Sequence, residues 1–356
     1  MSTLENRLPD TGARLPPPPS PGSAAPLHRA GRPLRWTERP TPIVALAPMD
    51  GITDTAYRQV VRSFDRDVLL FSEFTSADGF LRSAKVRRRL DFDPEEQPYF
   101  VQLFGNTPQA FVEAALALQD QGVAGIDINM GCPSKKIVAS QHGSGLMRDV
   151  DLACRIVEAV ANACRVDVSV KTRLGWKNPG GLVAFTRSLV AAGASLITIH
   201  GRTYDQSFGG RAAWESIHAL KDHLTVPVLG NGDVQHFDDG VAKLGRLDGF
   251  MIGRAAIGNP WVFLRDPERR KPTMAERVET ILLHYRLIRE LKLADAANGL
   301  VRDPERLALI EFRKHLVGYL RGFDMAKHAR VALLEAQDPA GFLRLVEGLH
   351  TLRNAA

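Results

Sequence analysis

The chain has 356 residues, 44% of them hydrophobic, and a formal net charge of +6. This length supports a large core and a second, smaller domain, and the charge favours an anionic partner such as RNA. Three cysteines exclude a complete disulfide framework, no apolar run is long enough to span a membrane, and the N-terminus lacks the apolar stretch of a signal peptide. We therefore expect a cytoplasmic protein.

The first 38 residues form a polar, proline-rich segment that includes "RLPPPPSPGSAAP". Such a composition buries little apolar surface, so we predict that residues 1–38 form a disordered tail. We assign no role to this segment.

From residue 39 onward, short apolar runs alternate with segments of helical period such as 108–120, 149–164, 182–192 and 214–223. The runs are "IVALA", "VLLF", "YFVQLF", "GIDIN", "DVSVKT", "LITIH", "VPVLGNG" and "DGFMIG". Near-continuous apolar strands that alternate with helices indicate a parallel sheet covered on both faces. About eight such units over roughly 230 residues predict an α/β fold, a (β/α)8 TIM barrel over residues 39–264. No GxGxxG follows the first run, which disfavours a Rossmann sheet.

Residues 265–356 show only helical patterns. The segments are "MAERVETILLHYRLIRELKLA", "PERLALIEFRKHLVGYLRG", "MAKHARVALLEA" and "PAGFLRLVEGLHTLR". They predict a small C-terminal helical-bundle domain. Lys and Arg outnumber Asp and Glu here, which fits a polyanion partner.

Polar residues and glycines follow nearly every predicted strand. In a TIM barrel the carboxyl ends of the strands form one rim, where ligands bind. The candidate residues on this rim are Pro48, Met49, Asp50, Gln102, Asn129, Cys132, Lys171, Arg173, His200, Arg202, Asn231, Gly232, Asp233, Gly253 and Arg254. We expect them to surround one cavity.

Two glycine-rich turns, "GNGD" and "IGRAAIG", follow the last two strands. Barrels commonly bind phosphate there through backbone N–H groups, a helix N-terminus and a cation, which would be Arg254. Lys171 lies in an apolar strand two residues before Arg173, so both side chains point to the same side. A lysine at the rim would stabilise a negative charge on a bound ligand, and His200 is a further candidate ligand contact.

The stretch "NMGCPSKK" places Cys132 between a glycine and a proline after the fourth strand. A metal site would need further Cys or His ligands, and only His142 is near, so we predict none. A nucleophile would need a base partner. A proton donor needs only its position and a protonated thiol, which an unperturbed cysteine supplies at neutral pH. Cys154 and Cys164 fall in a helical segment and are predicted core thiols.

The ordered set "APM", Gln102, "NMGCPSKK", "VKTR", "HGRT", "NGD" and "IGRAA" resembles the tRNA-dihydrouridine synthases. The resemblance runs from "LAPMDGITDTAYR" to about "RKHLVGYLRGF". It implies an FMN-dependent flavoenzyme with a barrel followed by a helical domain. It also implies that NADPH, through FMN, drives reduction of the C5=C6 bond of uridines in the tRNA D-loop, with hydride from flavin N5 reaching C6 and a proton from Cys132 reaching C5.

The resemblance also implies roles for the other rim residues. Pro48, Met49 and Asp50 would line the flavin. Gln102 and Lys171 would contact the isoalloxazine ring, with Lys171 near the N1/O2 edge. The ribityl and phosphate part would be held by His200, Asn231, Gly232, Asp233, Gly253 and Arg254.

We expect the helical domain to hold the tRNA. The segment "EFRKHLVGYLRGF" matches the family's C-terminal pattern, and its adjacent Arg313 and Lys314 would grip backbone phosphates while its aromatic residues stack on bases. At the rim, Asn129, Arg173 and Arg202 are the predicted substrate contacts. The basic run "KVRRRL" at 85–90 is a second candidate phosphate contact.

Three other interpretations stay open. A flavin-dependent paralogue that modifies ribosomal RNA would share these motifs. A barrel such as a dihydroorotate dehydrogenase would share the phosphate-binding turns but act on a free pyrimidine, without need of a basic helical domain. A non-catalytic RNA-binding relative would not need Cys132. For the synthase we expect a monomer with no obligate protein partner.

Overall fold

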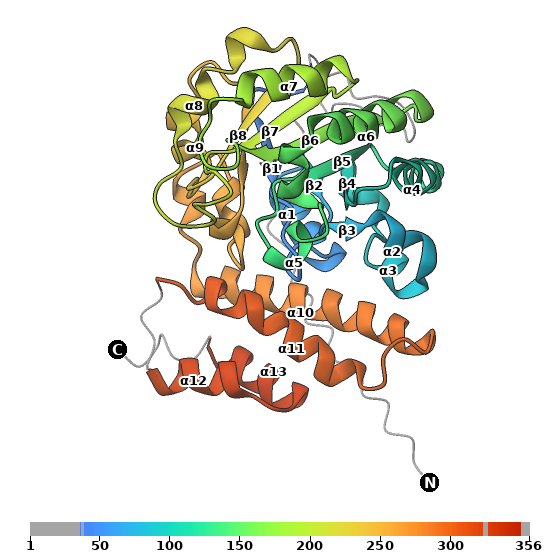
Figure 1. Ribbon diagram of the computed structural model, residues 1–356. Coiled ribbons are helices and arrows are strands. Elements are labelled where there is room, and N and C mark those ends of the chain that lie inside the picture. The colour runs from blue at the N-terminus through green and yellow to red at the C-terminus, as the bar shows by residue number, and fades with distance from the viewer. Residues whose placement is uncertain (1–35, 37–38, 323–326, 350–356) are drawn as a thin grey trace.

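The computed structural model describes residues 36, 39–322 and 327–349, in which parallel strands close into a barrel above a set of helices (Figure 1). The hydrogen-bonded order is β1-β9-β8-β7-β6-β5-β4-β2, and a bridge between Ala45 and Leu69 joins the two ends. The strands of this ring are β1 (Ile43–Leu46), β2 (Leu70–Phe71), β4 (Tyr99–Phe104), β5 (Gly125–Met130), β6 (Asp167–Arg173), β7 (Leu196–His200), β8 (Val228–Asn231) and β9 (Gly249–Ile252). The TIM-barrel prediction is confirmed, and each predicted apolar run coincides with one strand.

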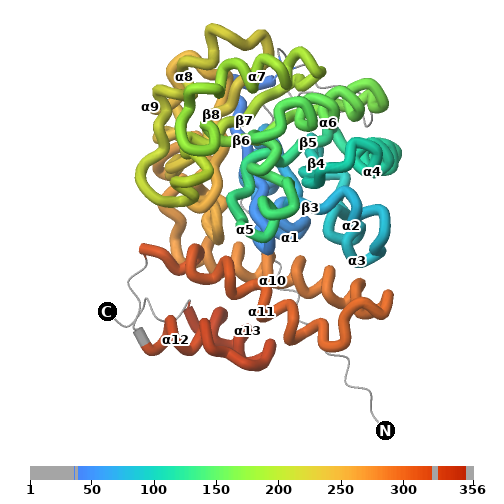
Figure 2. The backbone as a smooth tube through the Cα atoms, in the orientation of Figure 1, coloured from blue at the N-terminus to red at the C-terminus, as the bar shows by residue number. Residues whose placement is uncertain are grey.

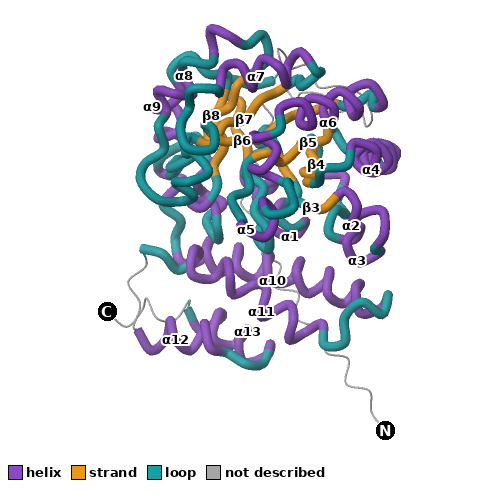
Figure 3. The backbone as a smooth tube through the Cα atoms, viewed as in Figure 1, coloured by secondary structure: helices purple, strands orange, loops and turns teal. Residues whose placement is uncertain are grey.

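Helices surround the strands of the barrel (Figure 3). They are α1 (Thr55–Phe64), α4 (Pro108–Asp120), α6 (Val150–Ala163), α7 (Leu182–Ala191), α8 (Trp214–His218) and α9 (Phe237–Leu244). Local signals fix where several begin: Asp54 and Asp149 cap α1 and α6 with their side chains, and Pro108 opens α4. The four predicted helical segments of the barrel contain α4, α6, α7 and α8.

Two short excursions beyond the regular βα units were not predicted. A two-residue strand, β3 (Thr75–Ser76), pairs with β4 and leads into α2 (Ala77–Arg82) and α3 (Ala84–Arg88). After β5 the chain forms α5 (Lys135–Val138) and a 3₁₀ helix, Gly143–Arg148. Both excursions follow the carboxyl ends of strands, and Lys85 and Arg88 of α3 line a hollow between the barrel and the C-terminal helices.

The barrel interior changes from apolar to polar toward its mouth. Ile43, Phe100 and Leu196 belong to a buried apolar cluster near the amino ends of the strands. Two residues further along β4 and β7, the side chains on the same face are the polar Gln102 and Thr198, because successive side chains alternate between the two faces of a strand. The floor of the barrel is thus a packed apolar core, and polar side chains face the mouth.

The C-terminal region is helical, as predicted. Its helices are α10 (Met274–Ala297), α11 (Pro304–Tyr319), α12 (Lys327–Glu335) and α13 (Pro339–Gly348). Figure 2 shows α10 and α11 nearer the barrel, with α12 and α13 beyond them. In the described part of the chain, none of the helices is long and apolar enough to cross a membrane.

The helices rest directly on the barrel. A Cβ on Gly258 would lie 1.9 Å from the carbonyl oxygen of His315 in α11, and a Cβ on Gly318 would lie 1.8 Å from that of Ile257. Backbone therefore meets backbone, and no side chain fits between the two. Tyr57 of α1 also packs against His315, with ring centroids 4.5 Å apart. The disorder predicted for residues 1–38 falls outside the described residues, except at Trp36.

Candidate active site at the barrel mouth

A cavity of about 750 Å³ opens at the carboxyl ends of the barrel strands. This size is in the range of cofactor and small-molecule pockets. Among the residues that line it are all the site residues predicted on the barrel: Pro48, Met49, Asp50, Gln102, Asn129, Cys132, Lys171, Arg173, His200, Arg202, Asn231, Gly232, Asp233, Gly253 and Arg254. The structure thus brings together residues from seven segments of the chain that are far apart in sequence.

The loop after β1 is held by a compact turn. Met49 N–H donates to Thr53 Oγ1 at 3.0 Å, and Thr53 N–H donates back to Met49 O at 3.0 Å. Gly51 has a φ of +70°, a conformation that glycine adopts without strain. The turn fixes Pro48, Met49 and Asp50 on the cavity wall.

Cys132 lies on a constrained loop after β5. Asn129 Oδ1 accepts hydrogen bonds from the N–H groups of Gly131, at 3.0 Å, and Cys132, at 2.9 Å. The carbonyl of Cys132 accepts from Ser144 N–H at 3.2 Å. A Cβ on Gly143 would lie 3.1 Å from Cys132 Cβ, so the neighbouring 3₁₀ helix packs tightly against the loop. The thiol is therefore presented to the cavity by a loop with little freedom.

The environment of Cys132 keeps its thiol protonated. Burial raises the pKa of Cys132 above its ordinary value, against the opposing effects of a backbone hydrogen bond at Ser134 and the charges of Arg173 and Lys171. A cysteine with a raised pKa is a thiol at neutral pH, and thus a source of a proton rather than a ready nucleophile. Cys154 and Cys164 do not line this cavity.

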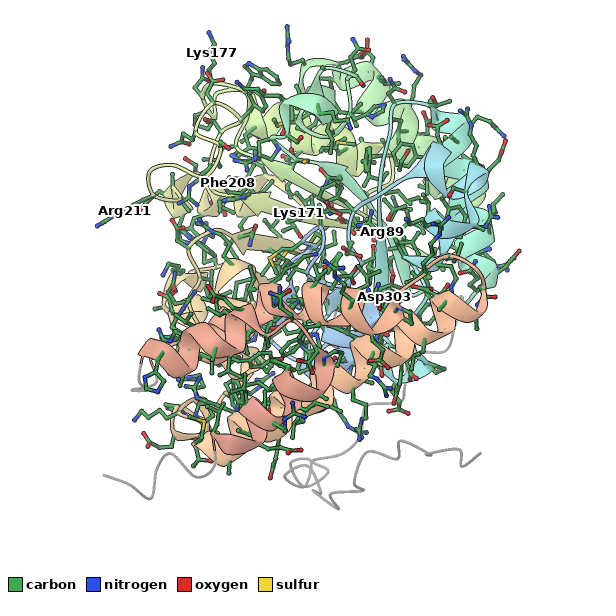
Figure 4. The ribbon with its side chains drawn as sticks, turned by 90° about the horizontal axis from the view of Figure 1, so that it is seen from below. Arg89, Lys171, Lys177, Phe208, Arg211 and Asp303 are labelled. Atoms are coloured by element: carbon green, nitrogen blue, oxygen red, sulfur yellow. The ribbon has the colours of Figure 1, made fainter. Side chains whose placement is uncertain are left out.

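Two basic side chains with lowered pKa values, Lys171 and His200, line the mouth and differ in charge at neutral pH. Burial lowers the pKa of Lys171 to about 8, helped by the charge of Arg173 and opposed by Asp127. Burial and the charges of Lys171 and Arg173 lower the pKa of His200 to about 2. His200 is therefore neutral, and its Nε2 lies 3.2 Å from Arg202 Nη1, so this nitrogen accepts. Lys171 supplies positive charge at neutral pH from the centre of the barrel (Figure 4).

Arg173 and Arg202, predicted as substrate contacts, are each only 2% exposed. Their guanidinium groups donate to the backbone carbonyls of Gly131, Thr203, Ser207, Gly209 and Gly210. Arg202 Nη2 also lies 2.8 and 2.7 Å from the two carboxylate oxygens of Asp233. In this conformation the two arginines hold the loop over residues 203–213, and only parts of their side chains line the cavity.

The last two strands end in a cluster suited to phosphate. Gly232 has a φ of +117°, and a Cβ there would lie 2.8 Å from the Cβ of Ala212. Arg254, just after Gly253, is 61% exposed, with its Nη2 3.3 Å from Asp233 Oδ1. An exposed guanidinium beside bare backbone turns can bind a phosphate group through charge-assisted hydrogen bonds. Within this group, Asn231 is structural in part, since its Nδ2 donates to Met251 O at 2.9 Å.

A second hollow, of about 780 Å³, lies between the barrel and the helices. Asp50 lines both hollows, and Lys314 lines only the second, where its Nζ donates to Gly51 O at 3.2 Å. The basic residues of the second hollow are Lys85, Arg88, Arg89, Lys292, Arg302, Arg306 and Lys314, and its acidic residues are Asp50, Asp54, Glu73, Asp91, Asp295, Asp303 and Glu311. It therefore includes three basic residues of the predicted run at 85–90.

The rest of the predicted RNA-binding segment of α11 is placed differently. Arg313 is partly buried, donates to the carbonyl of Ala336, and lines neither hollow. Tyr319 is fully buried, with its ring centroid 6.0 Å from that of Trp261. The prediction that aromatic residues of this segment stack on bases is therefore wrong for Tyr319, because it packs in the core. Arg321 lines the mouth cavity instead.

The sequence analysis missed Phe74, Phe208 and Asp127. Phe74 and Phe208 line the cavity, and Phe208, on the loop after β7, is 56% exposed at its edge. Asp127 is fully buried on β5. The signal for Asp127 was available, since it is an acidic residue in an apolar run, two positions before Asn129. Phe208 lies in an irregular loop, where no periodicity marks it.

The fold and the cavity together define a TIM-barrel protein with a ligand site at its mouth and a helical region against that mouth. The family model described as "Dihydrouridine synthase (Dus)" matches residues 45–356. The chain belongs to the dihydrouridine synthase family, as its motifs predicted.

Relatives of known name support this assignment. The chain is 35% identical over 302 residues to "Probable tRNA-dihydrouridine synthase 1" of Synechocystis sp., covering 82% of each chain. It is 35% identical over 303 residues to tRNA-dihydrouridine synthase B of Pseudomonas aeruginosa, covering 82% of this chain and 88% of the relative. It is also 35% identical over 321 residues to tRNA-dihydrouridine synthase B of Xanthomonas campestris, covering 85% and 91%.

Proposed function

We propose that this protein is a tRNA-dihydrouridine synthase, an FMN-dependent oxidoreductase that uses NADPH to reduce the C5=C6 bond of uridines in the tRNA D-loop. The observation that carries the proposal is Cys132, a protonated thiol on a constrained loop in the mouth cavity. Membership of the dihydrouridine synthase family supports the reaction, and the names of the relatives support tRNA as the substrate.

The cavity fits FMN in size and in chemistry. Its phosphate end would consist of Gly232, Gly253 and the exposed Arg254. Met49 gives an apolar wall for an aromatic ring, and Lys171 gives a positive charge at the centre. An apolar wall with a few convergent polar groups is the usual build of a cofactor site.

When bound, FMN supplies the hydride that reaches C6 of the uracil ring, and NADPH restores it. The residues of the chain do the rest. Lys171 would stabilise negative charge on the reduced cofactor, because its ammonium group is largely desolvated and, despite the nearby charge of Asp127, no carboxylate is hydrogen-bonded to it among the contacts described. The neutral His200 and the amide of Asn231 would orient the cofactor without adding charge.

Cys132 holds the proton that C5 receives. The hydrogen bonds from its loop to Asn129 Oδ1 keep the sulfur at a fixed place beside the cavity. Its raised pKa keeps the proton on sulfur until C5 gains electron density. The thiolate that forms lies near the charges of Arg173 and Lys171, which favour it.

The target uridine must leave the RNA stack to reach the floor of the mouth, since a base within a folded tRNA is not accessible there. The second hollow, next to the mouth, is the proposed site for the tRNA backbone on either side of that uridine. Lys314, Arg302 and Arg306 are its exposed cations on the helical side. Such phosphate contacts position the substrate and carry no sequence information by themselves.

The test uses purified protein loaded with FMN, NADPH without oxygen, and unmodified tRNA made by transcription. We expect the flavin absorbance to bleach on addition of NADPH, and dihydrouridine to appear in tRNA by mass spectrometry of nucleosides. Failure to take up FMN, or bleaching without dihydrouridine in any tRNA supplied, would contradict the proposal. Ribosomal RNA fragments run in parallel identify a paralogue that acts there instead.

A further inference from the structure

A buried carboxylate lies directly beneath the proposed active site and takes no part in the mechanism above. Asp127 on β5 is 0% exposed, and the barrel register places it between Gln102 on β4 and Ser169 on β6. Asp127 Oδ2 accepts from Gln102 Nε2 at 2.6 Å, and Oδ1 accepts from Ser169 Oγ at 2.6 Å. An ionised carboxylate is expensive to bury, so one in the floor of the barrel calls for a reason.

The hydrogen bonds continue upward from Asp127 to the loop of Cys132. Gln102 Oε1 accepts from Asn129 Nδ2 at 2.8 Å. Asn129 Oδ1 then accepts from the N–H groups of Gly131 and Cys132. Asp127, Gln102 and Asn129 are each less than 7% exposed, so water does not substitute for these partners in the folded state.

The direction of this chain is set at its lower end. A carboxylate only accepts, so the amide nitrogen of Gln102 must face Asp127. The amide oxygen of Gln102 must then face Asn129, and this turns the oxygen of Asn129 toward the two loop N–H groups. Reversing either amide would bring oxygen against oxygen or nitrogen against nitrogen.

We infer that Asp127 is a positioning residue, which orients Gln102 and Asn129 and through them fixes the loop that carries Cys132. The role assigned to that loop rests on the proposed function, but the geometry does not. Two further contacts hold the loop independently: Arg173 Nε donates to Gly131 O at 2.7 Å, and Ser144 N–H donates to Cys132 O. Loss of Asp127 should therefore loosen the loop without unfolding it.

The test measures how fast Cys132 reacts with iodoacetamide in cofactor-free protein. Cys154→Ala and Cys164→Ala in the parent leave Cys132 as the single thiol. Asp127→Leu removes the acceptor and fills its place, and Asp127→Ala removes it with less change of packing if the leucine variant does not fold. Alkylation rates are measured over a range of pH in which the thiol ionises. This separates a change in the pKa of Cys132 from a change in its accessibility.

We expect Asp127→Leu and Asp127→Ala to raise the limiting alkylation rate about fivefold, the effect of losing one buried hydrogen bond. Ser169→Ala is the matched control, because it removes the other hydrogen bond of Asp127 but leaves the path to Cys132 intact. It should leave the rate unchanged. Asp127→Asn should also stay near the parent rate, since its amide oxygen can face Gln102 while its nitrogen donates to Ser169.

Folded Asp127→Leu or Asp127→Ala protein with the parent's alkylation rate would overturn the inference. So would Ser169→Ala with the same increase, because a general loosening of the barrel floor would then explain it. Thermal unfolding of each variant shows which samples are folded. The measurement needs neither FMN nor tRNA, so it stands whether or not the protein forms dihydrouridine.

Discussion

Two hollows in the described part of the chain are similar in volume but differ in how their cations are placed. In the mouth cavity, Lys171 is a desolvated cation without a hydrogen-bonded carboxylate among the described contacts, and Arg254 is 61% exposed beside Asp233. In the second hollow three of the seven lining cations, Arg88, Arg89 and Lys292, are paired with carboxylates, and the others are exposed. Arg88 lies 3.1 Å from Asp91 and 3.2 Å from Asp295, and other pairs there include Arg89–Glu73 and Lys292–Glu311.

This difference indicates two kinds of ligand. A desolvated cation without a hydrogen-bonded carboxylate binds a small anion strongly, because no ion pair must be broken and the local dielectric is low. A surface of exposed cations and ion pairs binds a polyanion more weakly, since solvent and salt screen each contact and the paired carboxylates compete with the phosphates. The mouth is therefore built for tight binding and chemistry, and the second hollow for salt-dependent holding of the substrate.

Cys132→Ala separates the reaction from the binding of FMN and of tRNA, and it should give the largest change in activity. Loss of a positioned proton donor should slow dihydrouridine formation by about 10²- to 10⁴-fold. FMN content, bleaching by NADPH and tRNA affinity should stay near the parent values. The measurements are single-turnover dihydrouridine formation and tRNA binding in parallel. Cys154→Ala is the matched control, and a small effect of Cys132→Ala on turnover would remove the thiol from the mechanism.

Lys171→Met tests the desolvated cation of the mouth. Loss of a charge-assisted contact should weaken FMN binding about 10- to 100-fold, as followed by flavin fluorescence. Lys171→Arg keeps the charge and should lose less. A methionine variant that binds FMN as tightly as the parent would show that Lys171 does not face the cofactor.

The difference in stability between Lys171→Met and the parent protein should depend on pH. Folding lowers the pKa of Lys171 to about 8, below its unfolded value, so keeping it charged costs stability below pH 8 and costs nothing above the unfolded pKa. Lys171→Met should therefore raise the free energy of unfolding by roughly 1–3 kcal/mol at pH 7, and the gain should disappear as the pH rises through about 8 toward 10. Denaturant unfolding at several pH values gives both quantities.

The fold was predictable because its strands are continuous apolar runs and its helices show the helical period in the sequence. The eight apolar runs and the four helical segments of the C-terminal region each coincide with observed elements. What the sequence did not predict are the departures from the repeat, namely β3 with α2 and α3, and α5 with its 3₁₀ helix. These are short and irregular, and tertiary packing at the mouth, not local periodicity, decides their form.

The site was predictable to the extent that it follows the ends of strands. Position on the rim brought Cys132, Lys171 and the glycine turns together without knowledge of any contact. Contacts decide the rest. Arg173 and Arg202 have the right position, but their guanidinium groups hold backbone carbonyls, and such long-range partners are not visible in the sequence.

Arg302→Ala with Arg306→Ala tests the second hollow. Removing two exposed cations that line it should weaken tRNA binding about three- to tenfold at moderate salt and reduce its salt dependence, with FMN binding unchanged. Arg155→Ala with Arg187→Ala, on the exposed faces of α6 and α7, removes the same charge elsewhere and is the control. Equal losses for both pairs would mean that only net charge matters, and the second hollow would lose its role.

Asp127→Asn should give the smallest change, in stability rather than activity. Burial raises the pKa of Asp127 to about 6, against the opposing hydrogen bonds of Gln102 and Ser169 and the charge of Lys171. The folded state therefore pays for a charged carboxylate above pH 6 and not below the unfolded pKa of about 4. The neutral amide should raise the free energy of unfolding by roughly 1–2 kcal/mol at pH 8, and this gain should vanish between pH 6 and pH 4. Unfolding at these pH values measures it, and a loss of stability at pH 8 would show that the charge itself holds the barrel floor together.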